Sequence, residues 1–283
     1  GFGPDQSVLR LEQEFAQYRP DLIVLHLFAD NDFGDLIRNR LLTLDARGAL
    51  LREPPPADPD PCLVSDPCFP RESPGRRVRG FVASLKLVEA TRTLLGRSPW
   101  RRVMEPSVEH VIRSYLDLCE REYRVYARSQ PRTYSHMLDH YDSDVALFPD
   151  RASSRIKTAL MARLLETAAA FARSKGVTLI VTIEPSSRDL ATNLPVNFTH
   201  FRGFAGYRQS GMTDALERMA TDQGIPVLNL YRVFSAHDPA HLYREGPIDD
   251  HWSDAGQRLA ADTVAAFIRD GILGSASAGH GPP

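Results

Sequence analysis

A helical pattern followed by a short apolar stretch of strand length occurs three times in this chain. The apolar stretches cover residues 22–28, 177–183 and 226–230. Apolar spacing predicts the preceding helices over residues 5–18, 155–174 and 212–223. Such strands are typical of βαβ units, whose parallel strands are buried on both faces. The sequence therefore predicts an α/β fold with a parallel sheet. Because the first unit begins with a helix, we expect another strand to precede it.

Local signals mark the ends of these helices. Pro20 ends the first helix, and Gly176 is expected to cap the second. The apolar stripe of the first helix consists of Val8, Leu11, Phe15 and Tyr18. A last helix is expected over residues 254–268. Its inward-facing residues are Leu259, Val264, Phe267 and Ile268.

Length and composition indicate one domain. The chain has 283 residues, 42% of them hydrophobic, which is enough for a single α/β domain over residues 1–283. A net charge of −2 offers no basic surface for nucleic acid. No apolar run reaches the roughly 18 to 20 residues of a membrane span. We therefore expect a soluble protein, cytoplasmic or extracytoplasmic. Because Gly1 stands inside what resembles a motif, we interpret the chain as a fragment whose leader is not visible.

A long irregular segment, residues 33–150, separates the first helix and strand from the second pair. Seven prolines between positions 54 and 70 exclude a helix or a central strand there. Helical spacing returns over residues 82–95 and 108–125. We interpret residues 33–150 as a helical and loop cap, inserted over the ligand crevice. Residues 271–283 are expected to form a flexible tail.

The three cysteines do not form a disulfide framework. Cys62 and Cys68 share the proline-rich stretch and could form a disulfide in an oxidising compartment. Cys119 lies on an apolar helix face and is expected in the core.

A histidine pair in the same region has two interpretations. His136 and His140 are four residues apart, with Asp139 between them and Asp142 and Asp144 after them. Two histidines with this spacing on a helix can bind zinc. No glutamate lies between them, and the spacing indicates no third ligand. A solvated polar segment is the favoured interpretation, so we expect neither a metal nor another cofactor.

Asn31 follows the first apolar strand, where the ligand crevice of an open α/β sheet forms. Its side-chain amide can donate a hydrogen bond to an oxyanion in a transition state. The alternative is that Asn31 and Asp32 only cap the next helix. The residues themselves leave both interpretations open.

A second polar motif lies near the C-terminus. Asp249 stands two residues before His251, in a loop that leads into the last helix. A carboxylate in this position can hold an imidazole in one tautomer, as a general base requires. The alternative is a surface loop with an acidic helix start.

Four stretches of the chain together resemble a known family. They are residues 1–6, residues 18–25, Asn31-Asp32, and residues 249–253 with Gly256. In order and approximate spacing they are similar to conserved blocks of the SGNH (GDSL-type) hydrolases. The resemblance implies a flavodoxin-like, three-layer α/β/α sandwich with a parallel sheet, here without its first strand. It also implies catalysis without a metal or cofactor.

The resemblance assigns a role to each matching residue. His251 is implied as the general base and Asp249 as its orienting acid, with Asp250 beside it. The side chain of Asn31 and the backbone N–H of Gly1 are implied as oxyanion donors. The family's nucleophilic serine lies in a Gly-Asp-Ser block, which this sequence lacks. That block is therefore expected upstream of Gly1. The other serines considered are Ser7, Ser186, Ser187 and Ser253, and none stands in the family's position.

The expected function is hydrolysis of a carboxylic ester by a Ser-His-Asp mechanism. The substrate would be a small-molecule, carbohydrate or lipid ester, including O-acetyl esters. The alternatives are an O-acyltransferase and an inactive SGNH-like binding protein that keeps the crevice. Metal-dependent hydrolysis through His136 and His140 ranks last. The sequence does not indicate an oligomeric state.

Overall fold

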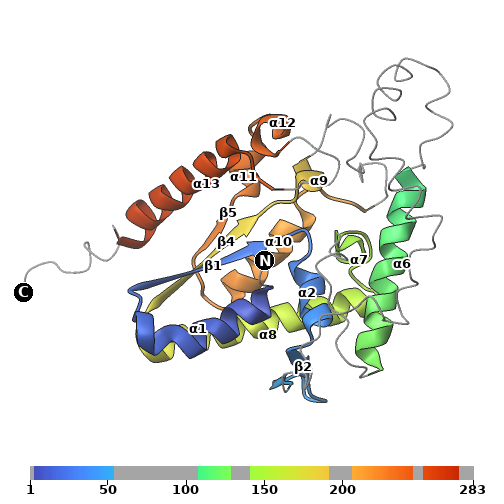
Figure 1. Cartoon of the computed structure of the whole chain (residues 1–283), viewed down its shortest axis with the longest axis horizontal. Helices are drawn as coiled ribbons and strands as arrows, with labels where there is room; N and C mark the ends of the chain where they lie inside the picture. The colour runs from blue at the N-terminus through green and yellow to red at the C-terminus, as the bar shows by residue number, and fades with distance from the viewer. Residues whose placement is uncertain (1–2, 54–107, 129–140, 191–205, 245–250, 274–283) are drawn as a thin grey trace, which may run out of the picture.

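The protein has an α/β fold built on a parallel sheet. The computed structural model describes residues 3–53, 108–128, 141–190, 206–244 and 251–273. In these residues β1 (Leu22–Phe28), β4 (Thr178–Glu184) and β5 (Val227–Asn229) pair in the order β1-β4-β5. All of these pairings are parallel, and Leu22 to Phe28 lie opposite Thr178 to Glu184 in one unbroken register (Figure 1). The predicted parallel sheet is confirmed.

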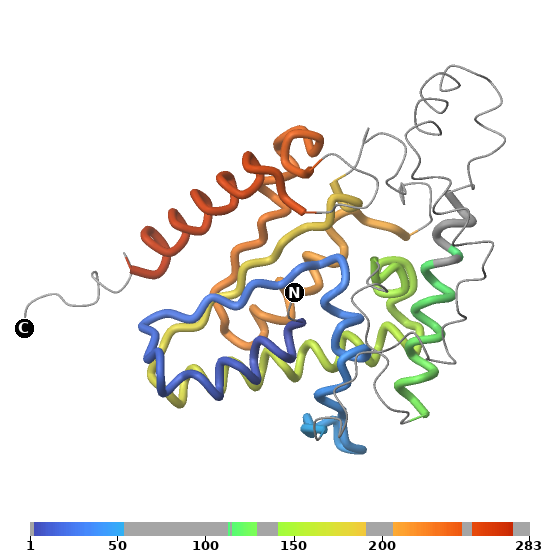
Figure 2. The backbone as a smooth tube through the Cα atoms, in the orientation of Figure 1, coloured from blue at the N-terminus to red at the C-terminus, as the bar shows by residue number. Residues whose placement is uncertain are grey.

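Each strand of this sheet follows the helix predicted for it. These helices are α1 (Pro4–Tyr18), α8 (Ala152–Lys175) and α10 (Gly211–Asp222). All three contribute buried residues to one core, together with Ile23, Leu25 and Leu27 of β1. They therefore cover the same face of the sheet, and α1 runs alongside α8 (Figure 2).

The predicted helix ends are also close to the observed ones. Gly176 ends α8 with a φ of 67°, a left-handed conformation that glycine adopts without strain. Val8 is buried, and Leu11 and Phe15 pack against the core as predicted. Tyr18 is 64% exposed, so its predicted core position is wrong. It occupies the last turn of α1, where it lines an open groove with Leu11 and Phe15.

The opposite face of the sheet is only partly covered. A second cluster lies there, formed by α11 (Tyr231–Phe234), α12 (Pro239–Leu242) and α13 (Asp254–Ala266). Figure 1 shows α13 on the other side of the sheet from α1 and α8. On β1, Val24 is 44% exposed, and the His26 side chain is exposed to the same extent. The expectation that both faces of this strand are buried is therefore wrong, because no described helix covers this part of β1.

The last helix is less buried than predicted. Four residues were expected to face inward: Leu259, Val264, Phe267 and Ile268. All four are only half-buried. The helix continues as the π-helical segment η4 (Phe267–Leu273), which has no buried residue. Its end therefore projects away from the core.

Gly256 lies where α13 packs against the end of α12. A Cβ at this position would stand 2.2 Å from the carbonyl oxygen of Leu242. We therefore expect Gly256→Ala to lower the free energy of unfolding by about 1–3 kcal/mol, the usual cost of overpacking. Urea denaturation measures this loss. Gly271→Ala is the control, because its Cβ would meet no atom closer than 3.8 Å. Equal stability of both variants would contradict the packing described here.

Part of the 33–150 segment belongs to the main core. Its described elements are α2 (Asp32–Asn39), β2 (Leu42–Leu44), β3 (Leu50–Arg52), α6 (Val108–Ala127) and α7 (Ser143–Leu147). The helix predicted over residues 108–125 is confirmed as α6, and Cys119 is buried in it as predicted. The apolar residues of α2 join the core beneath β1. The helix predicted over 82–95, together with Cys62 and Cys68, lies outside the described residues.

None of the helices in the described ranges combines the length and the apolar character that a membrane crossing requires.

Candidate functional site

Asn31 lies at the carboxyl end of β1, directly before α2. It occupies the N-cap position, but its side chain makes no capping hydrogen bond. Asp32 does not cap the helix either, because its carboxylate accepts a hydrogen bond from the Phe28 backbone N–H at 2.7 Å. The helix-cap interpretation is therefore wrong for both residues. Within the described ranges, no residue forms a hydrogen bond with the Asn31 side chain.

The neighbours of Asn31 are tied to the loop that follows β4. The carboxylate of Asp30 accepts hydrogen bonds from Ser186 Oγ and Arg188 Nη1, each at 2.5 Å. Ser186 and Asp30 are both buried. Because the strands are parallel and adjacent, these two loops leave the same edge of the sheet. The loop after β1 is therefore held in place on both sides of Asn31, while the Asn31 amide stays uncommitted among the described residues.

His251 is exposed and lies close to the end of β4. Burial raises the pKa of the Glu184 carboxyl, and the charges of His26 and His251 oppose this shift. The backbone carbonyl of His251 accepts a hydrogen bond from the Arg244 N–H at 2.9 Å. Trp252 forms an isolated bridge with Tyr243. Tyr243 also donates its hydroxyl to the Pro185 carbonyl at 2.7 Å, directly after β4, so the backbone at His251 lies at the same edge of the sheet as Asn31.

The other predicted catalytic residues cannot be compared with the structure. Asp249, Asp250 and Gly1 lie outside the described residues, and so do His136 and His140. The roles assigned to Asp249 and Gly1, and the histidine pair, therefore remain predictions.

A polar chain that the sequence interpretation missed runs beside His251. The two ring nitrogens of His26 bond to Thr182 Oγ1 at 2.8 Å and to Glu184 Oε2 at 2.9 Å. The His26 ring also meets the Trp252 ring edge-on, with centroids 5.7 Å apart. A histidine within an otherwise apolar strand was the available signal. The apolar residues on both sides of His26 give no indication of its polar partners.

None of the four serines considered in the chain is a free nucleophile. Ser7 Oγ donates to the Gly3 carbonyl, and Ser253 Oγ donates to the His241 carbonyl. Ser186 and Ser187 are both fully buried. Their hydroxyl groups are engaged or inaccessible, and the nucleophile upstream of Gly1 stays a prediction.

Asp189 is a buried carboxylate beneath this site. It accepts hydrogen bonds from Tyr141 OH at 2.7 Å and from Tyr207 OH at 3.1 Å. Burial raises the pKa of Asp189 to about 7, although both tyrosine hydrogen bonds oppose the shift. Asp5, which accepts a bond from Asn39 Nδ2, has its pKa raised by burial to about 6. Both groups therefore hold protons in the folded state that they lose in the unfolded chain.

These two carboxyl groups predict an unusual pH dependence of stability. A folded-state pKa above the unfolded value contributes stability at low pH that is lost as pH rises through the folded pKa. From the ordinary value of 3.8 to about 7, Asp189 alone accounts for a loss on the order of 4 kcal/mol. We expect the free energy of unfolding to fall between pH 4.5 and pH 8. Urea denaturation across this range measures it, and Asp189→Asn should flatten the slope. A stability that rises with pH across this range would contradict the assignment.

A buried ionic cluster lies behind α2, where solvated residues were expected. Lys157 Nζ donates to Asp142 Oδ1 at 2.8 Å and to Asp144 Oδ1 at 2.9 Å. All three side chains are at most 1% exposed. The prediction that Asp142 and Asp144 belong to a solvated segment is therefore wrong, because the Lys157 ammonium compensates both carboxylates inside the core.

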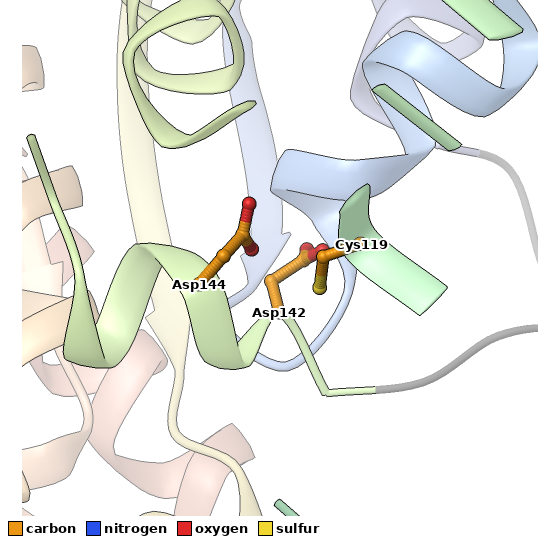
Figure 3. Close-up of side chains that lie close together, drawn as sticks. All are labelled: Cys119, Asp142 and Asp144. Atoms are coloured by element: carbon orange, nitrogen blue, oxygen red, sulfur yellow. The ribbon is translucent and has the colours of Figure 1, made fainter. Parts of the chain in front are cut away.

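The same cluster contains a possible set of metal ligands. Figure 3 shows Asp142 pointing toward Cys119 of α6, with Asp144 beside it on α7. The ligand atoms of these three residues lie within 4.8 Å of one another. A cation at their centre would compete with the Lys157 ammonium, whose pKa is raised by the surrounding carboxylates although burial lowers it. The cluster is thus an ion-pair network in which the Lys157 ammonium is the cation.

Comparisons with known proteins name no family. No family model matches the chain, and no curated protein matches it. A solved structure from Lactobacillus plantarum, a structural genomics target, is 22% identical over 40% of this chain, with a TM-score of 0.29. The match covers 55% of that protein, so this chain spans about half its length. A superposition this weak defines no shared fold.

Proposed function

We propose that this chain belongs to a serine ester hydrolase of the SGNH type, whose nucleophile lies upstream of Gly1. The observation that carries the proposal is the Asn31 side chain, which makes no hydrogen bond to a described residue although the groups around it do. A polar side chain left uncommitted at the carboxyl edge of a parallel sheet is suited to bind a ligand oxygen. His251 lies at the same edge.

The first sequence block packs on the helix that follows Asn31. A Cβ on Gly3 would stand 2.7 Å from Asn39 Nδ2 and 3.0 Å from Asp35 Cβ. Gly3 therefore packs directly on α2, the helix that begins after Asn31. Asp35 and Asn39 lie one and two turns beyond Asn31, so this contact joins the first block to the helix, and the role of the Gly1 N–H as an oxyanion donor rests on the family resemblance.

The topology supports a further strand upstream. The crossovers from β1 to β4 and from β4 to β5 run through α8 and α10, on the same face of the sheet. Right-handed crossovers on one face advance the strand order in one direction. Because α1 lies on that face too, the strand before α1 belongs on the side of β1 away from β4. Within the described ranges no strand pairs there.

The proposed reaction is acyl transfer from a carboxylic ester to water. The serine Oγ attacks the ester carbonyl carbon while His251 takes its proton. The amide of Asn31 and the N–H of Gly1 stabilise the oxyanion, each donor contributing on the order of 3–4 kcal/mol. The alcohol leaves with the proton from His251, and water then releases the acyl group by the same route. Asp249 would orient His251.

Hydrolysis of p-nitrophenyl acetate tests this function. The chain of residues 1–283 is compared with the protein extended upstream through the preceding strand. We expect turnover only in the extended protein, because only it would contain the serine. If the extended protein is inert towards short and long acyl esters, the ester hydrolase proposal fails. The alternative of a binding protein that keeps the crevice then becomes the better explanation.

A further inference from the structure

The loop that carries Asn31 is anchored by a residue from the far end of the 33–150 segment. The backbone N–H of Asp142 donates to the Asp30 carbonyl at 2.8 Å. The carboxylate Oδ2 of Asp142 accepts the Gly34 N–H at 2.6 Å. One residue thus holds the loop, defined here as residues 30–34, on both sides of Asn31.

A second contact fixes Asn31 itself. Arg38 Nη2 donates to the Asn31 backbone carbonyl at 2.8 Å and to Asp35 Oδ1 at 2.8 Å. Arg38 Nη1 reaches Glu122 Oε2 at 3.3 Å. The Arg38 side chain is only 2% exposed, so its contacts are made without competition from bulk water. The loop backbone is therefore held by buried charged groups.

The packing around Gly34 leaves no room for an additional side-chain atom. A Cβ on Gly34 would lie 2.4 Å from Arg38 Nη1 and 2.5 Å from Asp142 Oδ1. Lys157 holds the Asp142 carboxylate in turn, at 2.8 Å. Asp142 uses one carboxylate oxygen for Lys157 and the other for Gly34. A single carboxylate thus joins the ionic cluster to the loop.

We infer that Asp142, held by Lys157, is a positioning residue that fixes the Asn31 amide in its oxyanion-binding geometry. This inference rests on the proposed ester hydrolysis. Asp142 does not touch the reacting atoms in this account and acts only through the loop. A displacement of about 1 Å in a transition-state donor can reduce the rate 100-fold.

Asp142→Asn separates this role from a general effect on stability. In Asp142→Asn one of the two terminal positions becomes an NH₂, which cannot accept a hydrogen bond. The Lys157 ammonium attracts the remaining oxygen, so we expect the Gly34 N–H to lose its acceptor. The matched control is Asp144→Asn, because Asp144 also pairs with Lys157 but makes no described hydrogen bond to residues 30–34. Both variants disturb the ionic cluster, and only Asp142→Asn loosens the loop.

The first measurement is a double-mutant cycle in the extended protein. Asp142→Asn is expected to lower kcat about 10- to 100-fold with KM almost unchanged, while Asp144→Asn leaves kcat near the wild-type value. In an Asn31→Ala background, Asp142→Asn should lower kcat little further, because the donor it positions is gone. Losses that multiply in the double variant would overturn the inference.

The second measurement does not depend on activity. Amide hydrogen exchange at Gly34 is expected to become at least about tenfold faster in Asp142→Asn but not in Asp144→Asn. If the extended protein hydrolyses no ester, the proposed function fails, and this exchange rate alone decides whether Asp142 holds the loop. Unchanged exchange at Gly34 in Asp142→Asn would overturn the inference whatever the activity.

Discussion

Replacing His251 with alanine in the extended protein is expected to lower kcat for ester hydrolysis by about 10⁴- to 10⁶-fold. Without an imidazole to take its proton, a serine hydroxyl remains a weak nucleophile at neutral pH. The oxyanion donors and the substrate-binding surface would remain, so some activity above the uncatalysed rate should persist. KM should change little, because His251 acts in the transition state.

His241→Ala is the matched control for this experiment. His241 lies on α12 with its side chain 80% exposed, and it has no role in the proposed reaction. Its replacement should leave kcat within about twofold of the wild-type value, as is usual for surface substitutions. If His251→Ala retains wild-type turnover, another group must accept the proton, and the general base has been wrongly assigned.

Replacing Lys157 with methionine is expected to lower the free energy of unfolding by about 3–5 kcal/mol, the usual cost of removing one partner of a buried ion pair. Methionine fills most of the volume but leaves Asp142 and Asp144 without their cation. Burial raises the pKa of Asp144, yet the charge and hydrogen bond of Lys157 bring it to about 2. In the variant this carboxyl should take up a proton, so its stability should recover as pH falls.

Arg163→Met on the same helix is the control for this loss. Arg163 pairs with Glu166 at 2.6 Å, but both side chains are 47% exposed. Exposed ion pairs of this kind contribute about 0–1 kcal/mol. Chemical denaturation of both variants at pH 7 compares the two effects. If Lys157→Met loses no more than Arg163→Met, then the buried cluster is not compensated in the way described.

Regular elements could be predicted because their signal is local. The strand predicted over residues 177–183 and the helix predicted before it have ends within a few residues of those observed for β4 and α8. Apolar periodicity and the glycine at position 176 are sufficient for that. The exposure of Val24 could not be predicted, because it depends on what covers β1 and not on β1 itself.

The buried charges could not be predicted from spacing alone. Asp142 and Asp144 read as solvated because their partner is 13 to 15 residues away in the sequence. One signal was available in α8. Lys157 stands three and seven residues before Leu160 and Leu164, on the buried side of the helix. A lone lysine on an apolar stripe predicts a buried acidic partner.

The candidate site was predictable in part. The sequence proposes Asn31 and His251 as site residues, and both lie at the carboxyl edge of the sheet. It did not identify His26 and Glu184, which lie on the neighbouring strands β1 and β4 and bond to each other at 2.9 Å. That pairing joins residues 158 positions apart and depends on the register of β1 against β4.

The most direct test of the central claim is covalent labelling of the extended protein with a fluorophosphonate, followed by mass mapping of the labelled peptide. Such reagents react with a serine that is activated by a neighbouring base. The account predicts one label on a serine upstream of Gly1, formed much more slowly in His251→Ala. A label on Ser186 or another serine within residues 1–283 would contradict it, and so would a complete absence of labelling.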